Sequence, residues 1–222
     1  MTQTLTAAEL EEIGLIAIVR TDADTDLMRV AEALAEGGIR AMEITLNTPG
    51  ALPAIGAVRR AFSPAMRVGA GTILGPQDAR AAFEAGAEFL VTPTLQPDTI
   101  AYCRDNALPI ACGCMTPTEA LAAHQAGADF IKLFPADTLG PAYVRALRAP
   151  LPFLRIIPTG GVSLDTLALF LQAGCVGVAL GSNLVSKTVL QNQDWDALAA
   201  TARRYVQTFA SARAALKGET LA

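Results

Sequence analysis

The sequence is poor in the residues that build metal centres. It contains one histidine, His124, and four cysteines, and no two of the cysteines form a C-x-x-C pair. Catalytic zinc sites commonly use several histidines, and structural zinc sites use closely spaced cysteine pairs. His124 lies in the helical pattern "EALAAHQAGA", so we interpret it as an ordinary helix residue. We therefore expect chemistry that needs no metal and no other cofactor.

Charge and long hydrophobic runs are also scarce. Charged residues make up 17% of the chain and the net charge is -4, without the basic stripe of a nucleic-acid-binding protein or a polybasic membrane anchor. Polar residues or glycines interrupt every apolar run before the roughly 20 residues that span a membrane. The N-terminal "MTQTLTAAELEEIG" lacks the basic flank and apolar centre of a signal peptide. We expect a cytoplasmic protein that binds neither nucleic acid nor membranes.

What the sequence does contain is a regular series of short apolar, β-branched runs. The eight runs span 15–20, 40–46, 66–72, 88–93, 108–113, 129–135, 153–161 and 176–182. Turn residues and then an alanine- and leucine-rich helical pattern follow each run. Eight strand–helix units predict one (β/α)8 TIM barrel domain over residues 1–222. A doubly wound open sheet is the alternative if two of the runs are loops.

Residues typical of helix ends support this alternation. Thr116, Pro117 and Glu119 have the spacing of a capping box, and Thr48 before Pro49 indicates another helix start. Four helical patterns end in a glycine, in "EGGIR", "EAGAEF", "QAGADF" and "QAGCVG".

Two further helices are expected outside the eight units. "LTAAELEEIG" predicts a short helix before the first strand that closes the bottom of the barrel. At the other end Asp194 is an expected N-cap. After it, an apolar stripe at helical spacing predicts an amphipathic C-terminal helix, formed by Trp195, Leu198, Ala202, Val206 and Phe209.

The sixth run, "FIKLFP", carries a lysine among apolar residues. Alternation along a strand places Phe130, Lys132 and Phe134 on one face, and we expect this face to point into the barrel. Burial lowers the pKa of an ammonium group, and a neutral lysine amine is a good nucleophile toward a carbonyl. A buried ion pair is the competing interpretation of Lys132.

Two other ionisable residues are predicted near Lys132. The same alternation directs Glu43 of the second run inward, and Arg20 ends the first run. Glu43 could be the partner of Lys132 in an ion pair or a group that moves protons, so position alone leaves both interpretations open.

Small residues end three other strands. "GAGT" (69–72) brings two glycines and Thr72 to the end of the third strand, while "TGG" (159–161) and "GS" (181–182) end the seventh and eighth. In TIM barrels the loops after strands seven and eight frequently bind phosphate through backbone N–H groups. A nucleophilic lysine, a carboxylate and a phosphate site together suit a phosphorylated keto compound.

Several motifs also match a known family. They are "IVR" (18–20), "EITLNTPGA" (43–51), "VGAGTIL" (68–74), "VTP" (91–93), "FIKLFPA" (130–136), "IPTGGV" (157–162) and "ALGSNLV" (179–185). In this order, over about residues 13–190, they resemble the 2-keto-3-deoxy-6-phosphogluconate and 2-keto-3-deoxy-6-phosphogalactonate aldolases. The resemblance implies a metal-free, homotrimeric class I aldolase that releases pyruvate and glyceraldehyde 3-phosphate.

The resemblance also implies roles for individual residues. Lys132 is similar to the lysine that forms the Schiff base, and Glu43 to the group that shuttles protons. Thr72 and the adjoining backbone resemble the group that holds the pyruvyl carboxylate. The other implied substrate contacts are Arg20, Asn47, Pro93, Thr159, Gly161, Gly181 and Ser182.

One position departs from the gluconate-type pattern. Well-known gluconate-type members carry arginine where this chain has Asn47, whereas Thr159 is similar to the gluconate type and galactonate-type members can carry valine there. We expect a galactonate-specific or dual-specificity enzyme, with Val91 and Thr159 near the substrate's C4. A sugar-phosphate epimerase on the same barrel, or a barrel that only binds a phosphorylated metabolite, are the alternatives.

Overall fold

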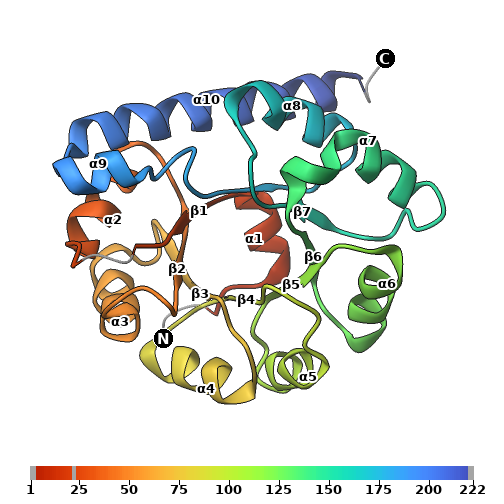
Figure 1. Ribbon diagram of the computed structural model, residues 1–222, viewed down its shortest axis with the longest axis horizontal. Coiled ribbons are helices and arrows are strands. Elements are labelled where there is room, and N and C mark those ends of the chain that lie inside the picture. The colour runs from red at the N-terminus through yellow and green to blue at the C-terminus, as the bar shows by residue number, and fades with distance from the viewer. Residues whose placement is uncertain (1–3, 22–23, 220–222) are drawn as a thin grey trace.

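The computed structural model is a barrel of parallel strands inside a ring of helices, and it describes residues 4–21 and 24–219 (Figure 1). The strands are β1 (Leu15–Val19), β2 (Ala41–Thr45), β3 (Arg67–Gly71), β4 (Leu90–Val91), β5 (Ile110–Cys114), β6 (Phe130–Leu133), β7 (Ile156–Pro158) and β8 (Val178–Leu180). They hydrogen-bond in the order β7-β6-β5-β4-β3-β2-β1-β8, and a parallel bridge between Thr159 and Ala179 joins the two ends. The predicted TIM barrel is confirmed, and the open sheet is wrong.

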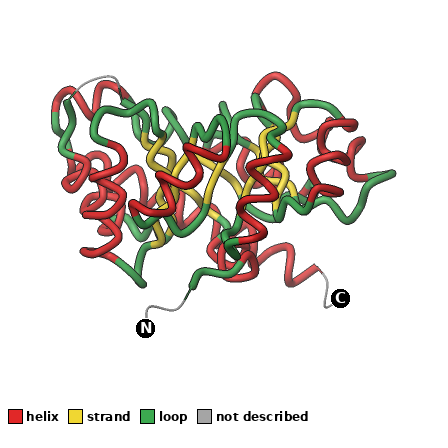
Figure 2. The backbone as a smooth tube through the Cα atoms, turned by 90° about the horizontal axis from the view of Figure 1, so that it is seen from below, coloured by secondary structure: helices red, strands yellow, loops and turns green. Residues whose placement is uncertain are grey.

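The barrel is surrounded by helices, of which all but the first cover its outside, as the side view in Figure 2 also shows. They are α1 (Ala7–Ile13), α2 (Leu27–Glu36), α3 (Ala51–Phe62), α4 (Pro76–Ala85), α5 (Pro97–Asp105), α6 (Pro117–Ala126), α7 (Ala136–Arg148), α8 (Leu164–Gln172), α9 (Lys187–Asn192) and α10 (Trp195–Glu219). No helix in the described part of the chain is both long and apolar enough to cross a membrane. Residues 1–3, part of the segment in which we expected no signal peptide, lie outside the described residues.

Most of the predicted helix ends are confirmed. The capping box of Thr116 and Glu119 begins α6. In each of the four glycine motifs one glycine has a positive φ, which only glycine adopts without strain. These are Gly38 (φ 85°), Gly86 (φ 108°), Gly127 (φ 100°) and Gly174 (φ 96°).

The predicted helix start at Thr48 is wrong. Helix α3 begins later, at Ala51, with Gly50 as its N-cap residue. The Thr48 hydroxyl is buried instead, 3.1 Å from the Thr45 hydroxyl, and it accepts a hydrogen bond of 3.3 Å from the backbone N–H of Thr21. Thr48 therefore joins the carboxyl ends of β1 and β2, and its hydroxyl does not cap a helix.

Alternation along the strands separates two apolar clusters. The outward residues pack against the helices; on β6 these are Ile131 and Leu133. A smaller cluster fills the barrel interior, composed of Leu5, Leu10, Ile16, Ile18, Ala41, Phe89, Val91, Ala111, Phe130, Ile157 and Ala179. Phe130 on the interior side confirms that the face carrying Lys132 points inward.

Helix α1 closes the bottom of the barrel, as predicted, and Figure 1 shows it across the middle of the ring of strands. Leu10 belongs to the interior cluster and is 2% exposed. An ion pair joins Glu11 of α1 to Arg155, whose guanidinium lies 4.2 Å from the centre of the Phe130 ring. Arg155 thus links α1, the plug of the barrel, to the ring of Phe130, two positions before Lys132.

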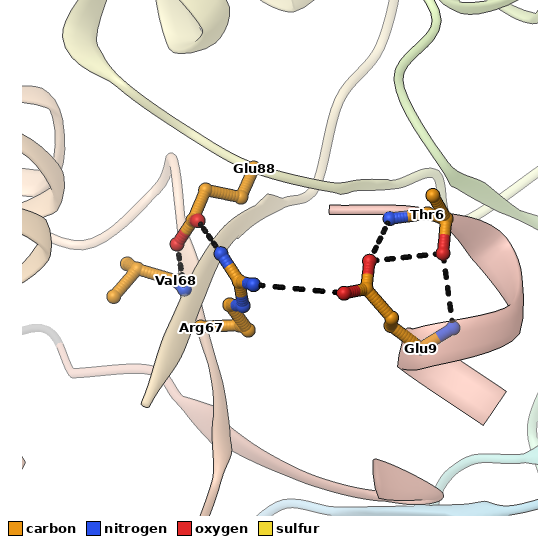
Figure 3. A network of polar contacts seen from close by, with 5 residues as sticks. All are labelled: Thr6, Glu9, Arg67, Val68 and Glu88. Carbon is orange, nitrogen blue, oxygen red and sulfur yellow. Dashed lines mark hydrogen bonds and ion pairs between the residues drawn. The ribbon is translucent and has the colours of Figure 1, made fainter. Parts of the chain in front are cut away.

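A second polar network binds α1 to the strands (Figure 3). Arg67 donates a 2.8 Å hydrogen bond to Glu88 and lies 4.0 Å from Glu9 of α1. Glu88 also accepts from the backbone N–H of Val68, and Glu9 forms a capping box with Thr6. Arg67 and Glu88 are buried, so each offsets the cost of desolvating the other.

The C-terminal helix α10 packs on α2 and α8, and Figure 1 shows it running along one side of the barrel. Asp194 caps it by accepting a 3.0 Å hydrogen bond from the N–H of Ala197. The predicted apolar stripe lies against the core, with Leu198 and Ala202 fully buried. This helix is therefore an integral part of the outer layer.

The plug generates the first prediction. Leu10→Ala should lower the free energy of unfolding by about 2–5 kcal/mol, because the substitution leaves a cavity in the barrel interior. Leu169→Ala in α8 is the matched control, since Leu169 is 47% exposed and its truncation should cost less than about 1 kcal/mol. Urea unfolding of both variants measures the difference, and equal losses would contradict the role of Leu10.

Candidate active site

Lys132 lies inside the barrel near the carboxyl end of β6 and is 5% exposed. Its Nζ atom is 5.4 Å from the centre of the Phe134 ring. No Asp or Glu among the described residues lies within 4.0 Å of Nζ, as an ion pair would require. The ion-pair interpretation of Lys132 therefore finds no support in the geometry.

Glu43 lies inward on β2 and is 1% exposed. Its Oε1 atom is buried and has no hydrogen-bond partner among the described residues, an uncommon state for a carboxylate oxygen. A side chain at position 71 would place its Cβ atom 1.7 Å from Oε1, so Gly71 of the neighbouring strand makes the room for this carboxylate. The third strand of the barrel thus has a glycine there because Glu43 occupies the space.

The two ionisable groups influence each other without touching. Burial lowers the pKa of Lys132, the negative charge of Glu43 opposes this shift, and Arg20 adds to it. Burial raises the pKa of Glu43, while the positive charges of Lys132 and Arg20 act to lower it. Desolvation is the larger effect on both pKa values. Near neutral pH the amine is therefore neutral, and the carboxyl protonated, more often than the same groups in water.

A cavity of about 500 Å³ opens above these groups at the carboxyl ends of the strands. Its wall includes five of the predicted site residues: Arg20, Asn47, Thr159, Gly181 and Ser182. Phe134, which lies beside Lys132, also lines it, and so does Ile18, the register partner of Glu43. The cavity is thus adjacent to the buried lysine and carboxylate.

The loops after β7 and β8 form one side of the cavity. Gly160 and Gly161 have φ angles of 90° and 70°, so the turn after β7 needs glycine at both positions. Asn183 fastens the two loops together, since its side-chain amide donates a 2.9 Å hydrogen bond to the carbonyl of Val162. Thr159 lines the cavity with a buried hydroxyl that has no partner within residues 4–21 and 24–219.

Three of the predicted substrate contacts do not line the cavity. Gly161 lies behind Gly160, against the first turn of α7. Thr72 follows β3 with a φ of 58°, an unusual conformation for threonine that is found more often at functional sites. Pro93 follows β4, and its carbonyl lies so close to Gly113 that a Cβ atom there would be 2.3 Å from the oxygen.

Sequence reasoning missed several residues of the cavity wall. Thr21, Phe134, Gly160, Val185 and Lys187 line it, although none was predicted as a substrate contact. Phe134 and Gly160 lie within motifs that were recognised, so their neighbours in sequence could have indicated them. Lys187 follows the last motif, and no signal in the sequence singled it out.

Comparison with known proteins agrees with this geometry. The family model described as "KDPG and KHG aldolase" matches residues 6–201. The chain belongs to this aldolase family. It is therefore a carbon–carbon lyase, and its barrel is the scaffold of an enzyme.

Individual relatives cover most of the chain. A "2-dehydro-3-deoxy-phosphogluconate aldolase" of Pseudomonas aeruginosa is 37% identical over 205 residues, which are 91% of this chain and 92% of the relative. A "2-dehydro-3-deoxy-6-phosphogalactonate aldolase" of Escherichia coli is 36% identical over 174 residues, 78% of this chain and 85% of the relative. Relatives named for both epimers thus match this aldolase to a similar degree.

Solved structures are similar to this chain in fold. One described as "Native KDPGal structure" superposes with a TM-score of 0.83 at 34% identity and covers 89% of this chain and 95% of its own. A structure described as "a cube-shaped, highly porous protein cage designed by fusing symmetric oligomeric domains" reaches a TM-score of 0.84 at 32% identity, covering 93% of this chain and 76% of its own. The barrel fold is therefore shared with solved structures of about one-third sequence identity.

The contact between Gly71 and Glu43 generates the second prediction. Gly71→Ala should lower kcat by roughly 100-fold, because the new methyl group displaces the carboxylate of Glu43, the expected proton-transfer group, and misplacement of such a group by about 1 Å can cost that much. Steady-state kinetics with the cleaved substrate measure the effect.

Gly75→Ala is the matched control for this variant. Gly75 follows the same strand by four residues, and a Cβ atom there would meet nothing within 4 Å. It should retain the wild-type kcat. If Gly71→Ala kept full activity while folded, Glu43 would not need its present position.

Proposed function

We propose that this aldolase cleaves 2-keto-3-deoxy-6-phosphogalactonate, 2-keto-3-deoxy-6-phosphogluconate or both into pyruvate and glyceraldehyde 3-phosphate through a Schiff base on Lys132. The observation that carries the proposal is a buried lysine with a lowered pKa beside a buried carboxylate that is not its ion-pair partner. Such an amine is neutral often enough to attack a ketone.

The proposed reaction begins at the substrate's C2 carbonyl. The neutral Lys132 amine adds to C2 to give a carbinolamine, and loss of water then gives a protonated imine. Glu43 supplies the proton that leaves with the hydroxide, since burial raises its pKa and keeps a proton available. The carboxylate that remains is the base for the next step.

Carbon–carbon cleavage follows from these protonation states. Glu43 takes the proton of the C4 hydroxyl, the C3–C4 bond breaks, and the bonding electrons move into the imine to form an enamine. The aldehyde fragment, glyceraldehyde 3-phosphate, departs. Protonation of the enamine at C3 and addition of water to the imine release pyruvate and the free lysine. The positively charged imine thus accepts the electrons of the broken bond and lowers the activation barrier to cleavage.

The remaining site residues receive binding roles. Thr72 and the backbone of residues 69–71 hold the pyruvyl carboxylate, and Pro93 limits the space at the end of β4. Arg20, Gly161, Gly181 and Ser182 bind the phosphate, which suits the N–H groups and small side chains of the loops after β7 and β8. Asn47 and Thr159 contact the middle of the substrate, with Val91 nearby on β4.

The proposal includes the assembly and location of the enzyme. We expect a homotrimer of single-domain barrels in the cytoplasm, with no metal in the reaction. Support for self-association comes from the exposure of large apolar side chains, of which Leu74, after β3, is the most exposed at 60%. Measurement of the molar mass in solution tests the trimer.

Trapping of the imine is the decisive test of the mechanism. Incubation with pyruvate and borohydride should leave a stable adduct on Lys132, because reduction converts the imine to an amine that cannot hydrolyse. The chain has three lysines, so peptide mass mapping can assign the adduct to a single residue. An active enzyme without any adduct would instead indicate a sugar-phosphate epimerase or another reaction without an imine.

Lys132→Met is the control variant for trapping. It should lose both the adduct and the cleavage activity, while its melting temperature stays unchanged or rises, because replacing a buried charge by an apolar chain of similar size is often neutral or stabilising. Retained cleavage in this variant would contradict the role of Lys132.

Selectivity between the two epimers generates a further prediction. Thr159→Val should lower kcat/KM for the gluconate epimer about 10-fold more than for the galactonate epimer. The buried Thr159 hydroxyl lacks a partner in the described part of the chain, so a substrate hydroxyl is its expected partner, and loss of such a bond costs about 1–2 kcal/mol. The ratio of kcat/KM for the two epimers measures the effect.

Thr99→Val provides the matched control. The Thr99 hydroxyl is also buried and has no partner among the residues that the structure describes, but it lies in α5, outside the cavity wall. The ratio between the epimers should be unchanged in this variant. An equal change in both variants would show that Thr159 acts on the fold and does not select the substrate.

A further inference from the structure

The charged residues in the wall of the cavity all have the same sign. Two of its lining residues are charged, Arg20 at the end of β1 and Lys187 at the start of α9, and both are cations. No Asp or Glu occurs among the described residues of the wall, although the chain as a whole has a net charge of -4. A concave site with cations and no acids concentrates anions.

The backbone around Lys187 is held in place by several hydrogen bonds. The N–H groups of Leu184 and Val185 both donate to the carbonyl of Gly181 at 2.9 Å, which folds the loop after β8 back on itself. Ser186 then caps α9, since its hydroxyl accepts a 3.2 Å bond from Val189. The first residue of α9 therefore follows closely on the Gly181–Ser182 turn at the end of β8.

Lys187 also borders a second, smaller cavity. This cavity of about 270 Å³ shares Thr21 and Lys187 with the first, and Asp24 lines it. Asp24 and Lys187 thus line the same smaller cavity, but Asp24 is not part of the wall of the active-site cavity. Lys187 is thus a lining residue of both cavities.

We propose that Lys187 binds the phosphate group of the substrate together with Arg20 and makes the enzyme selective for phosphorylated acids. This inference rests on the proposed function, because it assumes that a phosphorylated keto-deoxy acid occupies the cavity. A phosphate ester carries close to two negative charges at neutral pH, so one arginine neutralises only part of it. An ammonium on a flexible stem suits this task, since it binds phosphate oxygens as a compact charge.

The test compares the phosphorylated substrate with the same keto-deoxy acid lacking its phosphate. Lys187→Gln should lower kcat/KM for the phosphorylated substrate by about 10- to 100-fold, the range expected for a lost charge-assisted hydrogen bond. The value for the unphosphorylated acid should stay within about twofold of wild type. Lys187→Arg should recover most of the loss, because a cation is restored.

Lys217→Gln is the matched control for the loss of one positive charge. Lys217 is an exposed residue in the last turn of α10, outside both cavities. Its substitution changes the net charge identically and should leave both kcat/KM values unchanged. Equal losses in Lys217→Gln and Lys187→Gln would overturn the inference, as would equal losses on the two substrates in Lys187→Gln.

A measurement without turnover separates this inference from the proposed function. Trapping with pyruvate and borohydride needs no phosphate, so Lys187→Gln should form the adduct on Lys132 at the wild-type rate. Failure of the wild type to form an adduct would refute the Schiff-base mechanism itself. Loss of the adduct in Lys187→Gln alone, or an unchanged kcat/KM for the phosphorylated substrate, would refute the role of Lys187.

Discussion

The enclosure of the Lys132 ammonium in the barrel is the constraint on which the rest of the site depends. A charged amine at this depth costs several kcal/mol unless a counter-ion or another compensation is present. Glu43 is close enough to affect its pKa, yet the two groups form no ion pair. The cost is reduced when the amine is neutral, and the neutral amine is the form that attacks a carbonyl. The same desolvation that disfavours the charge therefore favours the neutral form that the proposed mechanism uses.

The bottom of the barrel maintains this environment. Leu10 of α1 and Phe130 of β6 fill the interior below Lys132, and the pair of Glu11 and Arg155 attaches α1 to the strands. Water that entered from below would solvate the ammonium and raise its pKa toward that of an exposed lysine. The apolar plug and the reactive group are thus parts of one arrangement, although they lie on different elements of the chain.

The carboxyl end of the barrel is polar where the bottom is apolar. Glycine turns after β7 and β8, the unpartnered Thr159 hydroxyl, and the cations Arg20 and Lys187 surround the cavity. A phosphorylated acid can be held there by its charges while its carbonyl reaches the buried lysine. Binding and reaction consequently use different regions: electrostatic attraction at the mouth and exclusion of water at the floor.

Local patterns in the sequence determined the strands, the glycine helix ends and the inward direction of Lys132 and Glu43, because alternation and capping depend on neighbours along the chain. Tertiary structure decided which residues come close together although they are far apart in the sequence. It showed that Lys132 and Glu43 lie apart without pairing, that Gly71 makes room for Glu43, and that Thr48 joins two strands and does not cap a helix. It also brought Lys187 to the cavity wall. These contacts join strands and loops far apart in sequence, so no local pattern could contain them.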